Sequence, residues 1–427
     1  MGKNLKMTKE EISWVLYDVG NSAFVLIMVT ALMPIYFKDV AAVGMSGAES
    51  TANWGFANST ASFILAILSP VLGAMADYQN MKKRFFLFFF TFGIGFTLLL
   101  LFIGEGQWLL CLVLFVFARV GWAGANVFYD AFLVDVTSRK RMDRISTLGY
   151  GYGYVGSVIP FLLVIVIILG SGMQEGLPIG AMRASFVIVA LWWLLFSLPA
   201  IRNLRQIYYL PADPAYITGS FKRLWRTIKE IRQYKQVFVF LSAYFFYIDG
   251  VGTIITMATA YGRDLGFGVT MLIVVLLFIQ LVAFPFALLF GRLAGIFSTR
   301  RMLMAGIGVY CLATLIAFYL PAIADPVQKN MAFWFIAFLV ASSMGGIQAL
   351  SRSYYGKLIP AEKSAEFFGF YNVFGKFAAI SGPLLMGLVG RMTGETRWGI
   401  LSILLLFVIG SVLLVGVSDS EEQYTAD

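Results

Sequence analysis

Long apolar runs separated by short polar segments make up most of the chain. Each run is long enough for a helix that crosses a bilayer, which needs about 20 predominantly apolar residues. The runs do not alternate with the period of two that barrel strands require, and backbone groups inside hydrocarbon must be satisfied within a helix. We therefore predict an all-α membrane protein with twelve spanning helices, over residues 13–37, 53–76, 85–103, 108–136, 146–170, 183–201, 236–260, 270–294, 302–322, 331–351, 367–390 and 398–417.

Lysine and arginine lie mostly on one side of these spans. With the N-terminus in the cytoplasm, 24 of them fall in cytoplasmic segments, six fall in external segments, and Arg119 and Lys376 lie within spans. Cytoplasmic loops of membrane proteins are enriched in positive residues, so both termini are predicted to be cytoplasmic. The net charge of +9 is thereby explained as a topology signal, and no nucleic-acid partner is expected.

The longest polar segment, residues 202–235, divides the predicted spans into two groups of six. We predict an N-terminal six-helix bundle over residues 1–201, a cytoplasmic linker over 202–235, and a C-terminal six-helix bundle over 236–427 that ends in a short acidic cytoplasmic tail. Residues 220–235 of the linker predict an amphipathic basic helix, which suits the anionic inner surface of a membrane. The sequence leaves two alternatives open: a solvated linker whose charges only set the topology, and a helix that binds a partner protein.

Two segments at the ends of the second and eighth spans resemble each other at a constant offset of 218 residues. The matched residues are Gly73, Asp77, Lys82 and Lys83 in the first segment, and Gly291, Gly295, Arg300 and Arg301 in the second. Such weak internal repetition is typical of transporters built from two parallel repeats. We interpret these residues as a cytoplasmic gate, in which glycine permits close helix contact, the aspartate caps a helix, and the basic pair holds the turn. The alternative is a tight loop with positive residues that set the topology.

The composition narrows the possible functions. Hydrophobic residues make up 59% of the 427 residues and charged residues only 13%, against about half and about a quarter in soluble domains. The chain has no histidine, which excludes histidine metal sites, Ser-His-Asp triads and histidine proton relays. We expect no enzymatic activity, no metal and no cofactor.

Several spans carry charged or amide side chains near the middle of the bilayer. A charge at the centre of a spanning helix costs about 2.5–3.5 kcal/mol on insertion scales, so such side chains generally face a protein interior or a watery cavity. We predict that Asp18, Asp130 and Asp249 couple transport to a proton or cation. The predicted substrate-binding residues are Arg119, Lys376, Asn21, Asn126, Gln280 and Asn372.

The same charges also have a structural interpretation. Arg119 with Asp130, or Lys376 with Asp249, could form buried ion pairs that hold helices together. The two interpretations are compatible, because an ion pair that breaks when substrate or a proton binds acts as a switch.

Six regions spread over nearly the whole chain resemble one family of the major facilitator superfamily. They are WVLYDVGNSAF at 14–24, SPVLGAMAD at 69–77, FYDAFLVD at 128–135 with GYGYVGSVIP at 151–160, YIDGVGTI at 247–254, GGIQALSRSYYGKLIP at 345–360 and AEFFGFYNVFGKFAAISGPL at 365–384. The family is named for a yeast vacuolar amino-acid effluxer involved in autophagy, and its bacterial members are known as the unknown major facilitator family. The resemblance implies the major facilitator fold with two pseudo-symmetric six-helix bundles, alternating access and, for the yeast-like members, export of amino acids. The short loops are closer to those of the bacterial members, which implies the plasma membrane of a bacterium.

The chain departs from the superfamily pattern after the second span, where Asn80 and Met81 replace the usual glycine and arginine. Asparagine tolerates the left-handed backbone conformation, so we expect the turn to form at Asn80. Gly295 stands where the second segment would carry its aspartate, so the two gates are predicted to differ.

Together, these features predict a proton- or cation-coupled secondary transporter of a small organic solute, with amino acids among the candidate solutes. The alternatives are a lipid or amphiphile flippase of the same fold and a substrate sensor that does not transport. The expected partners are the small-molecule substrate and the lipid bilayer, and the protein is expected to be a monomer.

Overall fold

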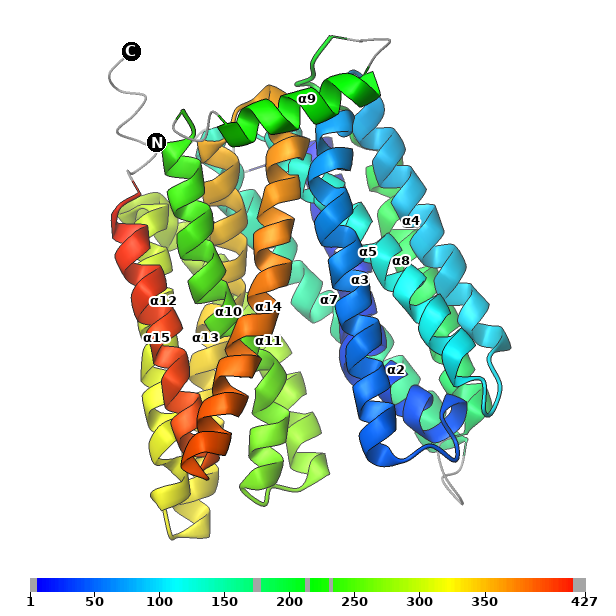
Figure 1. Ribbon diagram of the computed structural model, residues 1–427, viewed down its shortest axis with the longest axis vertical. Helices are drawn as coiled ribbons and strands as arrows, with labels where there is room; N and C mark the ends of the chain where they lie inside the picture. Colours follow the sequence, from blue (N-terminus) through cyan, green and yellow to red (C-terminus); the bar gives the residue numbers. More distant parts are fainter. Residues whose placement is uncertain (1–5, 172–177, 212–215, 230–232, 418–427) are drawn as a thin grey trace. The chain divides into compact units, whose positions relative to one another are not determined.

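A computed structural model describes residues 6–171, 178–211, 216–229 and 233–417 (Figure 1). The regular elements of this part of the chain are all helices, and one isolated bridge joins Tyr78 to Leu210. The elements, in chain order, are α1 Lys9–Ala23, η1 Phe24–Ala31, α2 Met33–Tyr36, η2 Phe37–Ala41, α3 Gly47–Ala76, α4 Met81–Leu99, η3 Leu100–Phe102, α5 Trp108–Ala131, α6 Leu133–Val136, η4 Arg139–Arg141, α7 Met142–Gly170, α8 Ile179–Asn203, α9 Tyr216–Lys229, α10 Lys235–Asp264, α11 Val269–Phe297, α12 Thr299–Tyr319, η5 Leu320–Ala322, α13 Pro326–Leu358, η6 Ala361–Lys363, α14 Ser364–Thr393 and α15 Thr396–Val415. The predicted acidic tail, residues 418–427, lies outside the described residues.

Twelve helices within the described ranges are long and apolar enough to cross a membrane. They coincide with the twelve predicted spans, which confirms the all-α membrane architecture. Several helices extend beyond the apolar runs, and α13 ends at Leu358 rather than at the predicted residue 351. The added turns carry Arg352 and Lys357, and both residue types are good helix formers.

The first span is not a regular α-helix. After α1 it passes through the π-helical stretches η1 and η2, in which backbone amides bond five residues back, as Leu32 N–H does to Ile27 O at 2.9 Å. Pro34 follows η1 and has no amide hydrogen to donate. π-helical turns are rare and are frequently found at functional sites, and this stretch directly follows α1.

The chain forms two compact units. Unit 1 contains Met1–Thr137, Tyr152–Leu224 and Ala361–Phe370. Unit 2 contains Ser138–Gly151, Trp225–Pro360 and Tyr371–Asp427. Two long helices therefore change unit along their length: α14 begins in unit 1 and α7 begins in unit 2.

The two units repeat the same set of helix pairings. In unit 1, α1 packs against α8, α4 packs against α5 and α8, and α3 packs against α5. In unit 2, the corresponding spans pair in the same way: α10 with α15, α12 with α13 and α15, and α11 with α13. These repeated pairings agree with the predicted fold class of two pseudo-symmetric six-helix bundles.

Helices α4 and α5 cross in unit 1 at two glycines. A Cβ atom on Gly121 would lie 2.4 Å from the Cα atom of Gly93, and one on Gly93 would lie 3.0 Å from the amide nitrogen of Trp122. Small residues of this kind let helix backbones approach closely inside a membrane. On the same α4, Gly95 has no neighbouring atom within 4 Å of its Cβ position.

Replacing Gly121 by Ala is expected to destabilise the protein by about 1–3 kcal/mol, because an overpacked contact forces the helices apart. The matched control, Gly95→Ala, adds the same methyl group in open space and should leave the Tm unchanged or raise it. The Tm of each purified variant in detergent measures both effects. Equal Tm values for the two variants would contradict the close crossing.

Candidate functional site

A hydrogen-bonded network in unit 1 is centred on Asn21 of α1. The Asn21 amide group donates to Asp18 Oδ1 at 3.1 Å and to the Tyr17 carbonyl at 3.2 Å. Its Oδ1 atom accepts from Trp122 Nε1 at 3.3 Å and from Asn126 Nδ2 at 3.4 Å, both on α5. Asp18 and Asn21 are buried. The network therefore brings together three of the predicted site residues, Asp18, Asn21 and Asn126, and joins α1 to α5.

Arg119 lies on the face of α5 that carries this network. Helical spacing places it on one stripe with Trp122 and Asn126, three and seven positions further along. Its half-buried side chain makes no hydrogen bond or ion pair with any residue that the structure describes. The ion pair with Asp130 considered from the sequence is therefore absent, since the two residues lie about 16 Å apart along one helix at ~1.5 Å per residue. A guanidinium has five N–H donors, and those of Arg119 are available to an anionic ligand.

The neighbours of Arg119 along α5 are aromatic. Phe115, one turn before it, packs on Trp54 of α3 with ring centroids 4.4 Å apart. Trp122, one turn after it, stacks on Phe24 of η1 with ring centroids 5.6 Å apart. Because both rings are held by neighbouring helices, the stretch of α5 around Arg119 is rigidly placed in unit 1.

Asp249 of α10 is buried in unit 2 and bonded to α14. Its carboxylate accepts hydrogen bonds from the Ser381 hydroxyl and, at 2.8 Å, from the Gly382 amide. A Cβ atom on Gly382 would lie 2.6 Å from Asp249 Oδ1, so the two helices approach closely here. No salt bridge joins Asp249 to Lys376 within the described chain, unlike the alternative considered from the sequence.

The other predicted binding residues of unit 2 are half-buried. Asn372 and Lys376 lie one turn apart on α14. The preceding residue, Tyr371, stacks on Tyr244 of α10 with ring centroids 4.3 Å apart. Gln280 lies on α11, and its Oε1 atom accepts no hydrogen bond from the residues described. Gln280 therefore has a free acceptor for a ligand or water.

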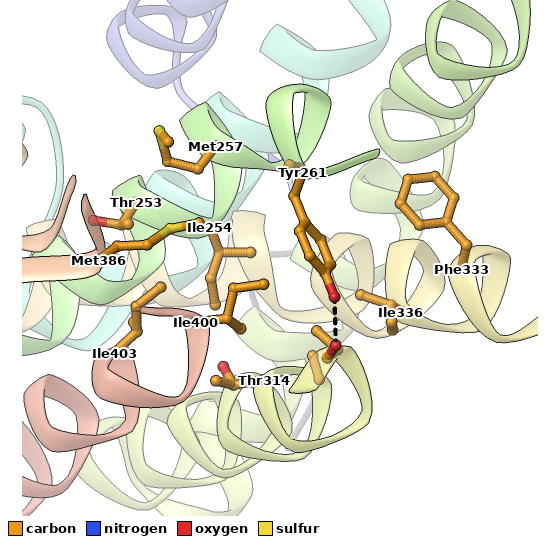
Figure 2. Close-up of a pocket in the computed structure, with 13 residues that line it drawn as sticks. Thr253, Ile254, Met257, Tyr261, Thr314, Phe333, Ile336, Met386, Ile400 and Ile403 are labelled. Carbon is orange, nitrogen blue, oxygen red and sulfur yellow. Dashed lines mark hydrogen bonds between the residues drawn. The ribbon is translucent and has the colours of Figure 1, made fainter. Parts of the chain in front are cut away.

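Unit 2 also contains a small apolar cavity (Figure 2). Side chains from α10, α12, α13, α14 and α15 line it, among them Ile254, Ile336 and Ile400. Tyr261 donates a hydrogen bond to Ala317 O at 2.8 Å beside the cavity. The volume of about 60 Å³ is well below the ~300 Å³ at the lower end of ligand pockets. No predicted site residue lines this cavity, and we do not assign it to a substrate.

At the end of α3, Asp77 caps the start of α14 within unit 1. Its buried carboxylate accepts hydrogen bonds from the amides of Ala365 at 2.8 Å and Glu366 at 3.1 Å. The first amides of a helix have no partner within the helix and attract negative charge. Gly73 lies one turn before Asp77, and a Cβ atom there would lie 2.2 Å from Ala365 O. Only glycine permits this approach.

Lys82 of α4 adds a buried ion pair to these contacts. Its Nζ atom donates to Asp135 Oδ2 at 2.7 Å and to Ser364 Oγ at 2.8 Å. Asp135 also accepts hydrogen bonds from the amides of Ile207 and Tyr208. A buried ion pair is tolerated when further hydrogen bonds satisfy both partners in this way.

Arg223 of α9 connects two acidic side chains in the same region. Its Nε atom donates to Glu366 Oε2 at 2.7 Å, and its Nη2 atom lies 3.4 Å from Asp77 Oδ2 and also donates to Ala74 O. The Asp77 cluster is our name for the six side chains Asp77, Lys82, Asp135, Arg223, Ser364 and Glu366. Lys83, the remaining predicted gate residue of unit 1, donates instead to Leu204 O at 3.0 Å.

The turn between α3 and α4 confirms the prediction for Asn80. Its φ angle is 62°, in the left-handed region that asparagine adopts more readily than most residues. Asn80 directly precedes α4, so this turn sets the position of Lys82 two residues later.

Burial raises the pKa of Asp77 to about 8, although the charges of Lys82 and Arg223 lower it. The neighbouring Glu366 raises it, and the hydrogen bond from the Ala365 amide lowers it. An aspartate in water has a pKa of about 3.9. The closed cluster therefore binds a proton more tightly than an opened one, and protonation favours the closed form.

Unit 2 has a counterpart of this cluster, with its carboxylate on a different element. Asp143, in the first turn of α7, accepts hydrogen bonds from Thr299 at 2.7 Å and Ser353 at 2.6 Å. It also forms a salt bridge with Lys357 at 2.5 Å. These four side chains are the Asp143 cluster. The end of α11 offers no carboxylate because Gly295 stands there, so the two sets of contacts differ, as the sequence predicts.

Two further contacts attach the start of α7 to the rest of unit 2. A Cβ atom on Gly291 would lie 2.1 Å from Thr147 Oγ1, so this glycine has the same role as its counterpart on α3. Arg352 of α13 donates from Nε to Ser146 Oγ at 3.0 Å and lies 4.4 Å from the centroid of the Tyr150 ring.

Arg300 and Arg301, the predicted basic pair of unit 2, are not members of the Asp143 cluster. Arg300 donates to Val417 O at 2.6 Å, beyond the end of α15. A cation at this position satisfies carbonyls that have no partner within the helix. Arg301 is exposed.

Several members of the two clusters were not predicted from the sequence. They are Asp135, Arg223, Ser364, Glu366, Asp143, Thr299, Ser353 and Lys357. Four of them lie in three of the regions that resemble the transporter family, so the resemblance could have pointed to them. The sequence does not reveal which basic side chain contacts which acidic one. Arg223 lies outside those regions, and the enrichment of cytoplasmic segments in Lys and Arg already explains the charges of the linker.

Comparisons with known proteins agree with a transporter. The family model described as "Vacuole effluxer Atg22 like" matches residues 48–138 and 134–426. A Bacillus subtilis (strain 168) relative, "Uncharacterized MFS-type transporter YxiO", is 48% identical over 418 residues, which cover 97% of this chain and 96% of the relative. "Autophagy-related protein 22-1" of Aspergillus fumigatus is 26% identical over 315 residues, which cover 67% of this chain and 50% of that protein.

Solved structures with the same fold are more distant in sequence. A bacterial homologue of the iron transporter ferroportin has a TM-score of 0.69 at 13% identity, covering 96% of this chain and 98% of its own. The proton:xylose symporter XylE has a TM-score of 0.69 at 13% identity, covering 97% of this chain and 98% of its own. At such low identity these likenesses show the fold alone, which is that of the major facilitator superfamily. Together with the match over residues 48–426 and the bacterial relative, they show that the chain belongs to the Atg22-like vacuole effluxer family of major facilitator transporters.

Proposed function

We propose that the protein is a secondary transporter that moves a small organic anion or zwitterion by alternating access, with amino acids as the first solutes to test. The observation that carries the proposal is Arg119, a half-buried arginine in a membrane span with no partner among the described residues, beside the Asn21 network. Ionisable residues inside membranes mark substrate or ion pathways. Membership of a transporter family supports transport itself.

In this proposal, Arg119 binds the carboxylate of the solute, because a guanidinium presents a planar fork of donors that matches a carboxylate. Asn21 and Asn126 orient the solute from the same unit. Gln280, Asn372 and Lys376 lie in unit 2 and remain predicted binding residues. Both termini are proposed to face the cytoplasm, as the distribution of Lys and Arg favours.

Asp249 is the proposed coupling residue. Its buried carboxylate is bonded to a hydroxyl and an amide but to no basic side chain within the described chain. Uptake of a proton would remove the charge of this carboxylate and alter its bonds to Ser381 and Gly382, and so link protonation to the contact between α10 and α14. Asp18 and Asp130 are the other candidates for this role.

The Asp77 and Asp143 clusters are the proposed cytoplasmic gates. Each cluster holds the first turns of a helix, α14 or α7, whose remaining turns belong to the other unit. Domain movements of the kind that alternating access requires break and re-form such contacts. We propose that release of these two clusters accompanies the opening toward the cytoplasm.

Counterflow of a radiolabelled solute into proteoliposomes tests the proposed function directly. Solute counterflow would support the transporter. Scrambling of lipid headgroups without counterflow would instead identify a flippase, and solute binding without flux would identify a sensor.

Replacing Arg119 by Gln is expected to weaken the binding of carboxylate solutes about tenfold to a hundredfold, since hydrogen bonds to charged groups contribute roughly 1.5–3 kcal/mol. Binding of solutes without a carboxylate should change little. Calorimetric titration of the purified protein with amino acids and with the corresponding amino amides measures the difference.

Arg183→Gln is the matched control for this experiment. Arg183 donates to Ile103 O at 2.6 Å, so its loss should lower the Tm and affect both classes of solute equally. If Arg119→Gln also affected both classes equally, Arg119 would be a structural residue and the proposal would fail.

Replacing Asp249 by Asn is expected to abolish pH-driven accumulation of the solute in proteoliposomes. Exchange of solute should persist in part, because exchange does not require net movement of the coupling ion. The control Ser381→Ala removes one hydrogen bond but keeps the carboxylate, so accumulation should remain. Accumulation that is unchanged in Asp249→Asn would rule out its coupling role.

The raised pKa of Asp77 predicts a pH-dependent gate. The closed cluster has a pKa of about 8 and an exposed aspartate one of about 3.9, so the extra stability of the closed form is present at low pH. It declines as the pH rises from ~4 to ~8 and is constant above that range. A bimane label at Glu362→Cys, in a chain without Cys111 and Cys311, should therefore report growing exposure of residues 361–370 as the pH rises toward about 8.

Two variants separate Asp77 from other titrating groups. Asp77→Asn cannot ionise and should show no such transition. Lys83→Gln lies outside the Asp77 cluster and should retain it. A transition that survives in Asp77→Asn would show that another group causes it.

A further inference from the structure

Helix α9 (Tyr216–Lys229) presents an apolar stripe to its surroundings. Ile217, Phe221 and Trp225 recur every four residues, and their side chains are 48%, 53% and 60% exposed. Side chains at this spacing lie along one face of a helix. Large exposed apolar side chains in a row usually mark a surface that contacts a partner or a membrane.

A basic stripe runs beside the apolar one. Lys222, Arg226 and Lys229 are all exposed. Lys222 and Arg226 each directly follow an aromatic residue of the apolar stripe, and Lys229 Nζ lies 5.4 Å from the centroid of the Trp225 ring. The α9 sequence contains no acidic residue, so the charge of this face is entirely positive.

The opposite side of α9 is buried and holds the helix in place. Ser220 and Thr227 are fully buried. Arg223 donates to Ala74 O and to Glu366, so α9 lies against the end of α3 (Figure 1). The part of α3 that is long and apolar enough to cross a membrane ends at Ala76, so α9 contacts the end of a candidate spanning helix.

We propose that the exposed face of α9 binds the headgroups of anionic phospholipids at the membrane surface. In this arrangement, Ile217, Phe221 and Trp225 insert into the interfacial region, where aromatic side chains are favoured. Lys222, Arg226 and Lys229 contact the phosphates. Amphipathic helices with aromatic and basic residues on adjoining faces bind anionic membranes in this way.

Two other interpretations of α9 fit less well. A solvated linker would leave three large apolar side chains in water at a cost in free energy. An acidic partner protein would also match the charge, but α9 contacts the end of a candidate spanning helix, and lipid headgroups surround the ends of spanning helices. The proposal concerns lipid binding alone and does not depend on which solute is transported.

The test measures binding of phosphatidylglycerol and phosphatidylcholine to the full-length protein in detergent, by native mass spectrometry. The triple variant Lys222→Gln, Arg226→Gln and Lys229→Gln should bind phosphatidylglycerol at least about tenfold more weakly, because each base near an anionic surface strengthens binding several-fold. Binding of phosphatidylcholine should not change. Arg223 is left intact in this variant, so the Asp77 cluster should remain.

A second triple variant is the matched control. Lys9→Gln, Arg84→Gln and Lys140→Gln remove the same charge from exposed positions outside α9 and should weaken phosphatidylglycerol binding by less than about threefold, because their loss changes only the long-range attraction. Equal losses in the two triple variants, or no loss in either, would overturn the proposal.

If the α9 triple variant does not fold, a variant that keeps every charge still tests the proposal. Phe221→Ser with Trp225→Ser keeps every base but removes the inserting side chains, so phosphatidylglycerol binding should fall while the Tm stays near that of the parent. Unchanged lipid binding in this variant would also count against the proposal. Loss of binding to an acidic peptide, with lipid binding retained, would identify a protein-docking surface instead.

Discussion

Inside a bilayer, a polar side chain without a partner raises the free energy of the folded state, and the cost is largest for an ionised group. Many hydroxyl side chains in the described spans bond a carbonyl of their own helix, as Thr97 does to Gly93 O, whereas Asn21 and Asp249 bond to neighbouring helices. The amide group of Asn21 donates a hydrogen bond to Asp18 and accepts hydrogen bonds from Trp122 and Asn126, so it joins α1 to α5. Asp249 joins α10 to α14 through a hydroxyl and an amide. The hydrogen bonds of Asn21 and Asp249 therefore also fix the position of one helix against another, so candidate site and scaffold share these contacts.

The same constraint explains why the Asp77 cluster and the Asp143 cluster differ. In unit 1, the carboxylate of Asp77 comes from the end of α3 and accepts the free amides at the start of α14. In unit 2, Gly295 provides no carboxylate, and Asp143 within α7 itself binds hydroxyls and Lys357 of the neighbouring helices. Asp77 is held mainly by neutral amides, whereas Asp143 is paired directly with a base. The pH dependence expected of the Asp77 cluster rests on Asp77.

A structural feature could be predicted from the sequence where residues close together in the chain determine it. The spans follow from runs of apolar residues, and the turn at Asn80 follows from the conformational tolerance of one residue, so both were predicted. The spacing of Arg119 and Asp130 already excludes a direct contact, because three helical turns separate them. The partners of Asp249 depend on how α10 is rotated against α14, and periodicity alone does not fix that rotation. Arg223 was not predicted, because its basic neighbours on α9 are exposed and the enrichment of cytoplasmic loops in Lys and Arg already explains them. Nothing in the sequence distinguishes Arg223 from these neighbours.

Three arginines of the described chain differ in the partners that the fold gives them. Arg183 donates to a carbonyl of the same unit, and Arg352 donates to Ser146 and lies over an aromatic ring. The fold thus provides partners for arginines that have a structural task, even at buried positions. Arg119 is on a rigid helix between two aromatic contacts, yet it has no hydrogen bond or ion pair within the part of the chain that the structure describes. An unpaired guanidinium at that depth has a free-energy cost that its own fold does not offset, and binding of an anionic solute would offset it.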